Sequence, residues 1–509
     1  MAAEEKDRTK LVLVGLMLGI LMSSMDNTIV TTAMGTIVSE LGGMNQFVWV
    51  TSAYMVAVMA GTPIFGKLSD MYGRKRFFLF GVCMFLIGSV LCGMAGSIVQ
   101  LSIFRAIQGI GGGALMPIAF TIIFDIFPVE KRGKMTGLLG AVFGTSSIFG
   151  PLLGAAITDS LGWNWVFYIN VPIGLAALCL IIFFYKESLS HEKQQIDWSG
   201  AATLVGAVVC LMFALELGGE KYAWNSTVII SLFAGFAILF LVFLLAERRA
   251  KEPIISFDMF RNRLYATSSL LALFYGSVFI VATVYIPIFV QGVFGGTATN
   301  SGVILMPMMI GSVVTSMAGG ILTSRMSYRS IMAISAVFFL SGIILLGTLT
   351  GDSSRMVMTV YSVITGFGVG FSFSVLGMAA VHPFDMHRRG AATSTNSFLR
   401  SLGMTLGITI FGIVQRNLMA DNMANAFQGM GQGGQAFGDT REILSQDKRA
   451  LIPPEILDKV TDAMASSIAH TFMWALIPLA AAALVVFAMP NDRIEAGEAA
   501  AAKPSEQHV

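Results

Sequence analysis

Asp26 is the residue whose type and position most directly suggest chemistry. It lies in SSMDNTIV within a long apolar stretch, where a carboxylate is costly and normally faces a cavity and has a function. Counted from Leu11, it lies about 22 Å along a helix, and Arg105 in LSIFRAIQGIGGG falls at a similar depth. We hypothesise that Asp26 binds a proton and that Arg105 tunes this binding, with a static ion pair as the alternative. Gln108, one turn from Arg105, could hydrogen-bond either residue.

A second group of charged residues lies in and near GKLSDMYGRKR, between two apolar stretches. The glycines allow tight turns, and Asp70 can cap a helix N-terminus or pair with Arg74. The basic residues are equally explained as a topology signal, but the nearby acids favour a latch that holds one conformation. The predicted gating cluster consists of Gly66, Asp70, Gly73, Arg74, Asp125 and Arg132.

Two further patterns are candidates for a bend and a substrate cavity. Glycine allows close helix approach and proline bends a helix, so GTSSIFGPLLGA predicts a functional bend or generic packing at Gly150, Pro151 and Gly154. Flexible methionines such as those of MPMMIG fill cores or line pockets that accept many shapes. The possible substrate cavity therefore consists of Asp26, Met306, Pro307 and Glu216.

The sequence argues against several other kinds of chemistry. Cys83, Cys92, Cys179 and Cys210 follow no metal or disulfide spacing, and we interpret them as small apolar side chains. We interpret the histidines of the loop at 382–387 as solvated. The motif GxxxxGK[ST] does not occur, which excludes an ATP-driven pump in one chain. A net charge of +2 provides no basic face for nucleic acid. We expect no metal and no cofactor.

The elements that must position these residues are membrane-spanning helices. Of the 509 residues, 55% are hydrophobic and 12% charged, and the mean hydropathy is +0.75, whereas soluble proteins carry about 25% charged residues. We identify fourteen apolar stretches of spanning length, and an even number places both termini on one side. The distribution of Lys and Arg predicts that this side is the cytoplasm. The stretches begin near Leu11, Phe47, Phe77, Ile98, Met135, Trp165, Ser199, Thr227, Leu264, Ser301, Ser330, Met356, Ala391 and Ser467.

Three sequence repeats predict two related halves. GKLSDMYGRKRF (66–77) is repeated as GILTSRMSYRS (320–330), EKRG (130–133) as HRRG (387–390), and QGIGGG (108–113) as TGFGVG (365–370), all at nearly one offset. Parallel halves with a substrate site between them are a known transporter plan. We predict a six-helix bundle at 1–187, two additional helices with linkers at 188–263, a second six-helix bundle at 264–488 and a cytoplasmic tail at 489–509. The long outer segment 415–466 is either a solvated linker or a mobile lid.

These motifs resemble those of the major facilitator superfamily. GKLSDMYGRKRF is similar to its loop signature, RAIQGIGGG to its fourth-span motif and GPLLGA to its exporter motif. SSMDNTIV and WNWVFYINVPIG resemble motifs of the fourteen-span drug:proton antiporters, especially bacterial multidrug exporters. The resemblance implies proton coupling at Asp26 and Arg105, an inner gate at Asp70, Arg74 and Asp125, and the antiporter bend at Gly150 and Pro151.

We therefore expect an all-α polytopic membrane protein of the major facilitator fold, with two pseudo-symmetric six-helix bundles and two additional central helices. The expected function is proton-driven export of small lipophilic, often cationic drugs by a secondary active transporter. We expect a monomer in the lipid bilayer of the bacterial cytoplasmic membrane. The alternatives are a same-fold exporter of a narrower cargo, such as a tetracycline, lipid or metabolite, and a membrane receptor or scaffold that transports nothing.

Overall fold

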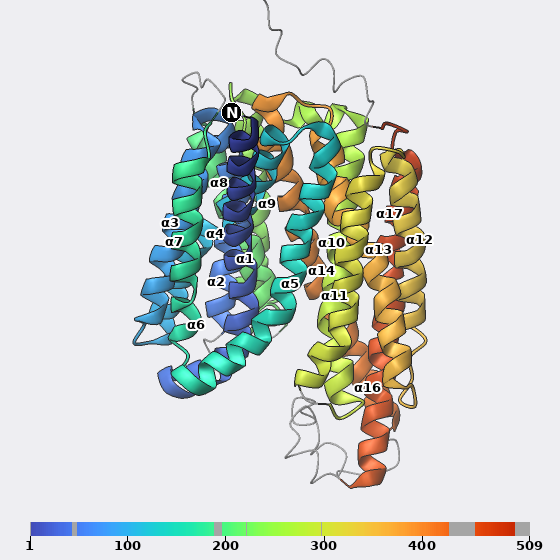
Figure 1. The fold of residues 1–509 in the computed structure, drawn as a ribbon. Helices are drawn as coiled ribbons and strands as arrows, with labels where there is room; N and C mark the ends of the chain where they lie inside the picture. Colours follow the sequence, from blue (N-terminus) through green and yellow to red (C-terminus); the bar gives the residue numbers. More distant parts are fainter. Residues whose placement is uncertain are drawn as a thin grey trace, which may run out of the picture.

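The computed structural model describes residues 2–42, 48–187, 196–219, 221–296, 298–426 and 453–493. These residues form long helices joined by short loops, with one isolated β-bridge between Gly218 and Tyr222. Among them, thirteen helices are long and apolar enough to cross a membrane. The 33-residue helix α5 (Val129–Leu161) runs beside these helices (Figure 1).

Helices of the first part of the chain pack mainly against one another. In this part α2 and α3 pack on α4, and α1 packs on α5 and α7. The bounds are α1 (Ala2–Leu41), α2 (Val48–Tyr72), α3 (Arg74–Gly93), α4 (Ile98–Ile126), α6 (Trp165–Tyr168) and α7 (Asn170–Phe184).

The later helices form a corresponding group. In this group α11 and α12 pack on α13, α10 packs on α14 and α14 packs on α16. The bounds are η1 (Phe257–Arg261), α10 (Arg263–Gly292), α11 (Ala298–Leu322), α12 (Tyr328–Leu346), α13 (Arg355–Val381), η2 (Met386–Arg388), α14 (Arg389–Ala426), α16 (Pro454–Trp474) and α17 (Leu476–Ala488).

The pair α8 (Trp198–Leu217) and α9 (Thr227–Arg249) lies between the two groups in sequence. The two helices pack on each other, and α8 also packs on α2. On α9, Ile230, Ile238 and Leu241 are exposed, as expected for side chains that face lipid. We infer that this pair is peripheral to the contacts between the two larger groups.

Local sequence explains where several helices begin. The side chains of Ser97, Asp197 and Ser226 accept hydrogen bonds from backbone N–H groups in the first turns of α4, α8 and α9. Asn262 caps α10 through the N–H groups of Leu264 and Tyr265. Such caps satisfy N–H donors that a helix cannot satisfy internally. They therefore favour helices that begin at these residues.

The described ends of the outer segment, 415–426 and 453–466, are more helical than the sequence predicts. We expect a short helix after Pro454 and a separate span from Ser467. Instead, one helix (α16) runs from Pro454 through Ser467 to Trp474, and α14 continues to Ala426. These extensions contact each other, because Asn422 Nδ2 donates to the carbonyl of Ala463 at 3.3 Å. The GMGQGGQ stretch, on which the lid or linker hypothesis depends, lies outside the described residues.

The two helical groups meet most closely at one end of the molecule. We call this end the terminal face, because α1 begins and α17 ends there (top of Figure 1). Across the groups, α5 packs on α11 and α2 packs on α14. Towards the opposite face α5 runs away from α11 (Figure 1). The two groups are therefore joined at the terminal face and diverge from it.

Candidate proton site and gating cluster

Asp26 and Arg105 are in direct contact in the interior of the first helical group. Both side chains are fully buried, and Arg105 Nη1 forms an ion pair with Asp26 Oδ2. Arg105 Nε also donates to the carbonyl of Val50 at 3.2 Å, and its guanidinium carbon lies 4.2 Å from the centre of the Tyr54 ring. A carboxylate, a carbonyl and an aromatic face together offset the cost of burying this guanidinium.

Two amide side chains complete the surroundings of Asp26. Gln108 Nε2 donates to Asp26 Oδ1 at 2.7 Å and to Ser89 Oγ at 2.8 Å, while Gln108 Oε1 accepts from Arg105 at 2.6 Å. Asn170 Nδ2 donates to the same Asp26 oxygen at 2.9 Å and to Ser89 at 3.3 Å. The carboxylate is thus held by donors from both α4 and α7.

Asn170 is a site residue that sequence reasoning missed. Its only sequence signal is a polar amide within the apolar stretch of WNWVFYINVPIG. The residue is fully buried, and its Oδ1 has no hydrogen-bond partner among the described residues. A buried acceptor that lacks a partner is costly. This oxygen can therefore accept a hydrogen bond from an O–H or N–H donor that forms at the site.

The glycines of the predicted bend form a packing surface for α1. A Cβ atom on Gly150 would collide with Thr28, and one on Gly154 with Thr32 and the backbone of Ile29. The same helices are joined by a hydrogen bond of 2.7 Å between Ser24 and Ser146. Close packing beside Asp26 therefore explains the glycines. Pro151 lies within α5, but its side chain is outside the described part, so the functional bend stays a prediction.

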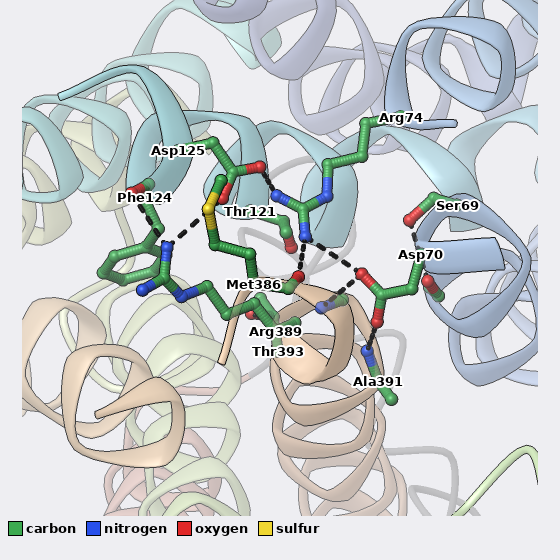
Figure 2. A network of polar contacts seen from close by, with 12 residues as sticks. Ser69, Asp70, Arg74, Thr121, Phe124, Asp125, Met386, Arg389, Ala391 and Thr393 are labelled. Atoms are coloured by element: carbon green, nitrogen blue, oxygen red, sulfur yellow. Dashed lines mark hydrogen bonds and ion pairs between the residues drawn. The ribbon is translucent and has the colours of Figure 1, made fainter. Parts of the chain in front are cut away.

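Asp70 caps a helix of the opposite group. Its two carboxylate oxygens accept hydrogen bonds from the backbone N–H groups of Gly390 at 2.9 Å and Ala391 at 2.8 Å, in the first turn of α14 (Figure 2). Arg74 Nη2 donates to Asp70 Oδ1 at 3.1 Å. A carboxylate at a helix N-terminus satisfies free donors and interacts favourably with the helix dipole. Both contacts that the sequence suggests for Asp70 therefore occur together.

Arg74, Asp125 and Arg389 continue this cluster across the terminal face (Figure 2). Arg74 forms an ion pair with Asp125 and donates to the carbonyl of Met386 at 2.5 Å. Arg389 Nη1 lies 3.3 Å from Asp125 Oδ1. The predicted member Arg132 donates from Nε to the carbonyl of Phe127 at 3.1 Å. Arg389, a residue of the HRRG repeat, joins the cluster at Asp125, and sequence reasoning did not assign it there.

Two pairs of glycines bring the groups into backbone contact. Gly66 faces Gly390 between α2 and α14, and Gly133 faces Gly320 between α5 and α11, with no room for a Cβ atom at any of the four. Gly66 and Gly320 hold equivalent places in the first repeat, and Gly133 and Gly390 in the second. The contact is therefore repeated by the pseudo-symmetry of the chain. Gly73, also predicted for this cluster, has φ of 109° and precedes α3.

The second half has a different polar pair at the place of Arg74 and Asp125. Tyr328 Oη lies 3.4 Å from His382 Nδ1, and the two rings are 5.5 Å apart. These residues hold the equivalent places in the repeats. His382 is partly exposed and contacts Tyr328, whereas His387 is exposed, as expected for a solvated loop residue. The equivalent places of the two halves thus hold different polar pairs.

The remaining residues of the predicted substrate cavity lie apart from the Asp26 network. Met306 and Pro307 are partly buried on α11, and Glu216 is partly buried near the end of α8. The polar contacts of Asp26 come from α4 and α7 instead. The substrate cavity of Asp26, Met306, Pro307 and Glu216 therefore stays a prediction.

Comparisons with known proteins agree with this architecture. A sequence model of the Major Facilitator Superfamily matches residues 16–408. The chain belongs to this family. It is 60% identical over 492 residues to Multidrug resistance protein 3 of Bacillus subtilis, covering 96% of each chain. It is 38% identical over 427 residues to the multidrug transporter protein MdtP of the same species, covering 82% of this chain and 78% of MdtP.

Solved structures show the same fold at low sequence identity. The human organic anion transporter MFSD10 matches with a TM-score of 0.59 at 15% identity, covering 92% of this chain and 99% of its own. The proton:xylose symporter XylE matches with a TM-score of 0.58 at 14% identity, covering 92% and 96%. The predicted family and all-α membrane fold are confirmed, and this major facilitator protein is a multi-pass membrane transporter rather than an enzyme.

Proposed function

We propose that this transporter exports lipophilic, often cationic drugs in exchange for protons. The two Bacillus subtilis relatives are named for multidrug resistance and multidrug transport, which supports drug export. The observation that carries the proton coupling is the fully buried carboxylate of Asp26, held by Arg105, Gln108 and Asn170. No cofactor is needed, because the proton gradient supplies the free energy.

The amides around Asp26 suit a carboxyl group that changes its protonation state. An ionised carboxylate accepts hydrogen bonds only, whereas a protonated one also donates. Asn170 Nδ2 donates a hydrogen bond to the ionised carboxylate of Asp26. After a rotation of the amide, the Oδ1 of Asn170, which lacks a partner among the described residues, can accept a bond from the protonated carboxyl group. Ser89, which accepts from both amides, keeps them beside the carboxyl group during this change.

Closure of the terminal face supports transport by alternating access. Asp70, Arg74 and Asp125 contact residues 386–391 of the second group there, and these contacts must break before a path on this side opens. With both termini in the cytoplasm of a bacterial cell, the structure is closed on the inner side. We propose that the protein works as a monomer, whose two pseudo-symmetric halves rock about a central substrate site.

The energy available from one proton is adequate for drug export. At a membrane potential of roughly 150 mV, one charge moving inward provides about 3.5 kcal/mol. Because about 1.4 kcal/mol corresponds to a tenfold ratio, one electrogenically imported proton supports a gradient of about 300-fold for a neutral drug. Competition between a proton and a cationic drug for the charge of Asp26 would couple the two flows.

An exchange assay with Asp26→Asn tests this function. Everted vesicles with an acidic interior should accumulate ethidium and release protons when they contain the wild-type chain. The variant keeps the size of the side chain but removes the titratable group, so accumulation should fall to the level of empty vesicles. Asp258→Asn is the matched control, because Asp258 is an exposed residue paired only weakly with Arg261 at 3.9 Å. Full proton-driven accumulation by Asp26→Asn would refute the assignment.

A further inference from the structure

Arg400 is a charged residue in the membrane interior that the proton site and gating cluster do not use. It lies eleven residues into α14, about 16 Å from the start of the helix. Its Nη1 donates to Ser372 Oγ at 3.3 Å, and its Nη2 donates to the carbonyl of the same residue at 3.0 Å. Its guanidinium carbon also lies 5.0 Å from the centre of the Phe373 ring.

Arg400 differs from the other deeply placed arginines in its lack of a carboxylate. Arg74, Arg105 and Arg389 each form an ion pair with an aspartate. Arg400 has no such pair within the described ranges. A guanidinium has five N–H donors in a planar fork. The two bonds to Ser372 leave its other N–H groups available to bind a further acceptor. The side chain is partly exposed, so this acceptor can reach it.

The position of Arg400 excludes two simple structural explanations. Long basic side chains can extend to the membrane surface from positions near helix ends, but Arg400 is far from both ends of α14. Phe373, which contacts the guanidinium, packs edge-to-face on Phe279 of α10 at 5.5 Å and also lies beside Gly140 of α5. Arg400 is therefore next to the junction of the two halves rather than on a surface that faces only lipid.

We propose that Arg400 binds the carboxylate of zwitterionic or anionic aromatic substrates. The guanidinium fork matches a carboxylate, and the bond is strong in surroundings of low dielectric constant. Phe373 and Phe279 provide an apolar surface for the aromatic part of the same molecule. This assignment rests on the proposed export function and adds a class of cargo to the cationic compounds.

Two dyes that differ only at a carboxyl group test this assignment. Rhodamine 110 carries a free carboxylate, and rhodamine 123 is its methyl ester. Binding to the purified full-length protein in detergent is measured by fluorescence anisotropy, and export is measured in everted vesicles. Arg400→Gln should weaken binding of rhodamine 110 about tenfold, equivalent to about 1.4 kcal/mol, while binding of rhodamine 123 changes less than twofold. Arg400→Lys keeps the charge but not the planar fork of N–H donors. It should bind rhodamine 110 with an affinity between those of the wild type and Arg400→Gln.

Arg416→Gln provides the matched control on the same helix. Arg416 is exposed and donates to the carbonyl of Gly219 at 2.9 Å, so its loss should affect neither dye. Equal weakening of both dyes by Arg400→Gln, or unchanged binding of rhodamine 110, would overturn the carboxylate site. If Arg400→Gln does not fold, equal affinities of Arg400→Lys and wild type for rhodamine 110 overturn it. Export of neither dye by wild type would instead count against the proposed export function.

Discussion

Replacing Asp70 by alanine should open the terminal face. The wild-type carboxylate accepts the N–H groups of Gly390 and Ala391, and these bonds exist only while the two halves are in contact. In the open form, water can satisfy the same N–H groups. Without Asp70, Arg74 and Arg389 share the single carboxylate of Asp125, so the excess positive charge between the two halves also disfavours their contact. The substitution therefore weakens the closed form selectively.

The size of this effect follows from the two bonds. A hydrogen bond to a charged group contributes about 1.5–3 kcal/mol, and the bonds to α14 measure 2.9 and 2.8 Å. A loss of about 3 kcal/mol from the closed form changes the ratio of closed to open molecules by about 140-fold. A closed population of about 99% would then fall below half.

Spin labels on the terminal face can measure this change. The background variant replaces Cys83, Cys92, Cys179 and Cys210 by alanine. Labels are attached at Lys186→Cys and Arg325→Cys, two exposed positions that belong to different halves. Pulsed electron resonance then gives the distribution of distances between the labels, in which Asp70→Ala should add a population at longer distance.

The second repeat contains a matched control for this experiment. Ser324 holds the place equivalent to Asp70, but it is exposed, and its side chain donates to the carbonyl of Ile321 in the preceding helix α11 at 2.8 Å. Ser324→Ala should therefore leave the distribution unchanged. A distribution for Asp70→Ala that is identical to that of the background, in a protein that still melts cooperatively, would show that the helix cap does not hold the face closed.

Two further predictions concern residues that position α1, α5 and α7. Asn170→Ala removes the 2.9 Å bond to Asp26 and should slow proton-driven ethidium export about tenfold, equivalent to about 1.4 kcal/mol. Ethidium binding in detergent should stay within twofold of wild type, and an unchanged export rate would remove Asn170 from the proton site. Gly133→Ala should abolish export, because its Cβ atom would collide with the backbone of Gly320. Gly377→Ala, whose Cβ atom meets no atom within 4 Å, should export ethidium normally, and equal activity of the two glycine variants would contradict this argument.

Much of the helical architecture could be predicted because its causes are local. The predicted starts at Ile98, Trp165 and Thr227 coincide with the first residues of α4, α6 and α9. Apolar length and side-chain caps act within a few residues, so they can be recognised in a single chain. The extension of α14 to Ala426 and the continuity of α16 through Ser467 differ from prediction because contacts such as that of Asn422 with Ala463 stabilise these turns.

The sequence predicted those residues of the candidate site whose charge is unusual within an apolar stretch. A carboxylate and an arginine are costly in apolar stretches, so Asp26 and Arg105 could be found without knowing their neighbours. Asn170 is neutral and carries a smaller cost, and only folding shows that its amide reaches Asp26. Arg389 was visible in a repeat, but its approach to Asp125 joins residues that are far apart in the chain.

The amino-acid sequence by itself determined that this chain is helical, crosses the membrane many times and is built from two related halves. Helix formation and transfer into lipid depend on composition over short windows, and repetition is a property of the sequence itself. The tertiary structure alone decided that Asp70 caps α14 rather than a helix near it in sequence. Which donors a carboxylate meets depends on how distant helices pack, because hydrogen bonds act only over contact distances.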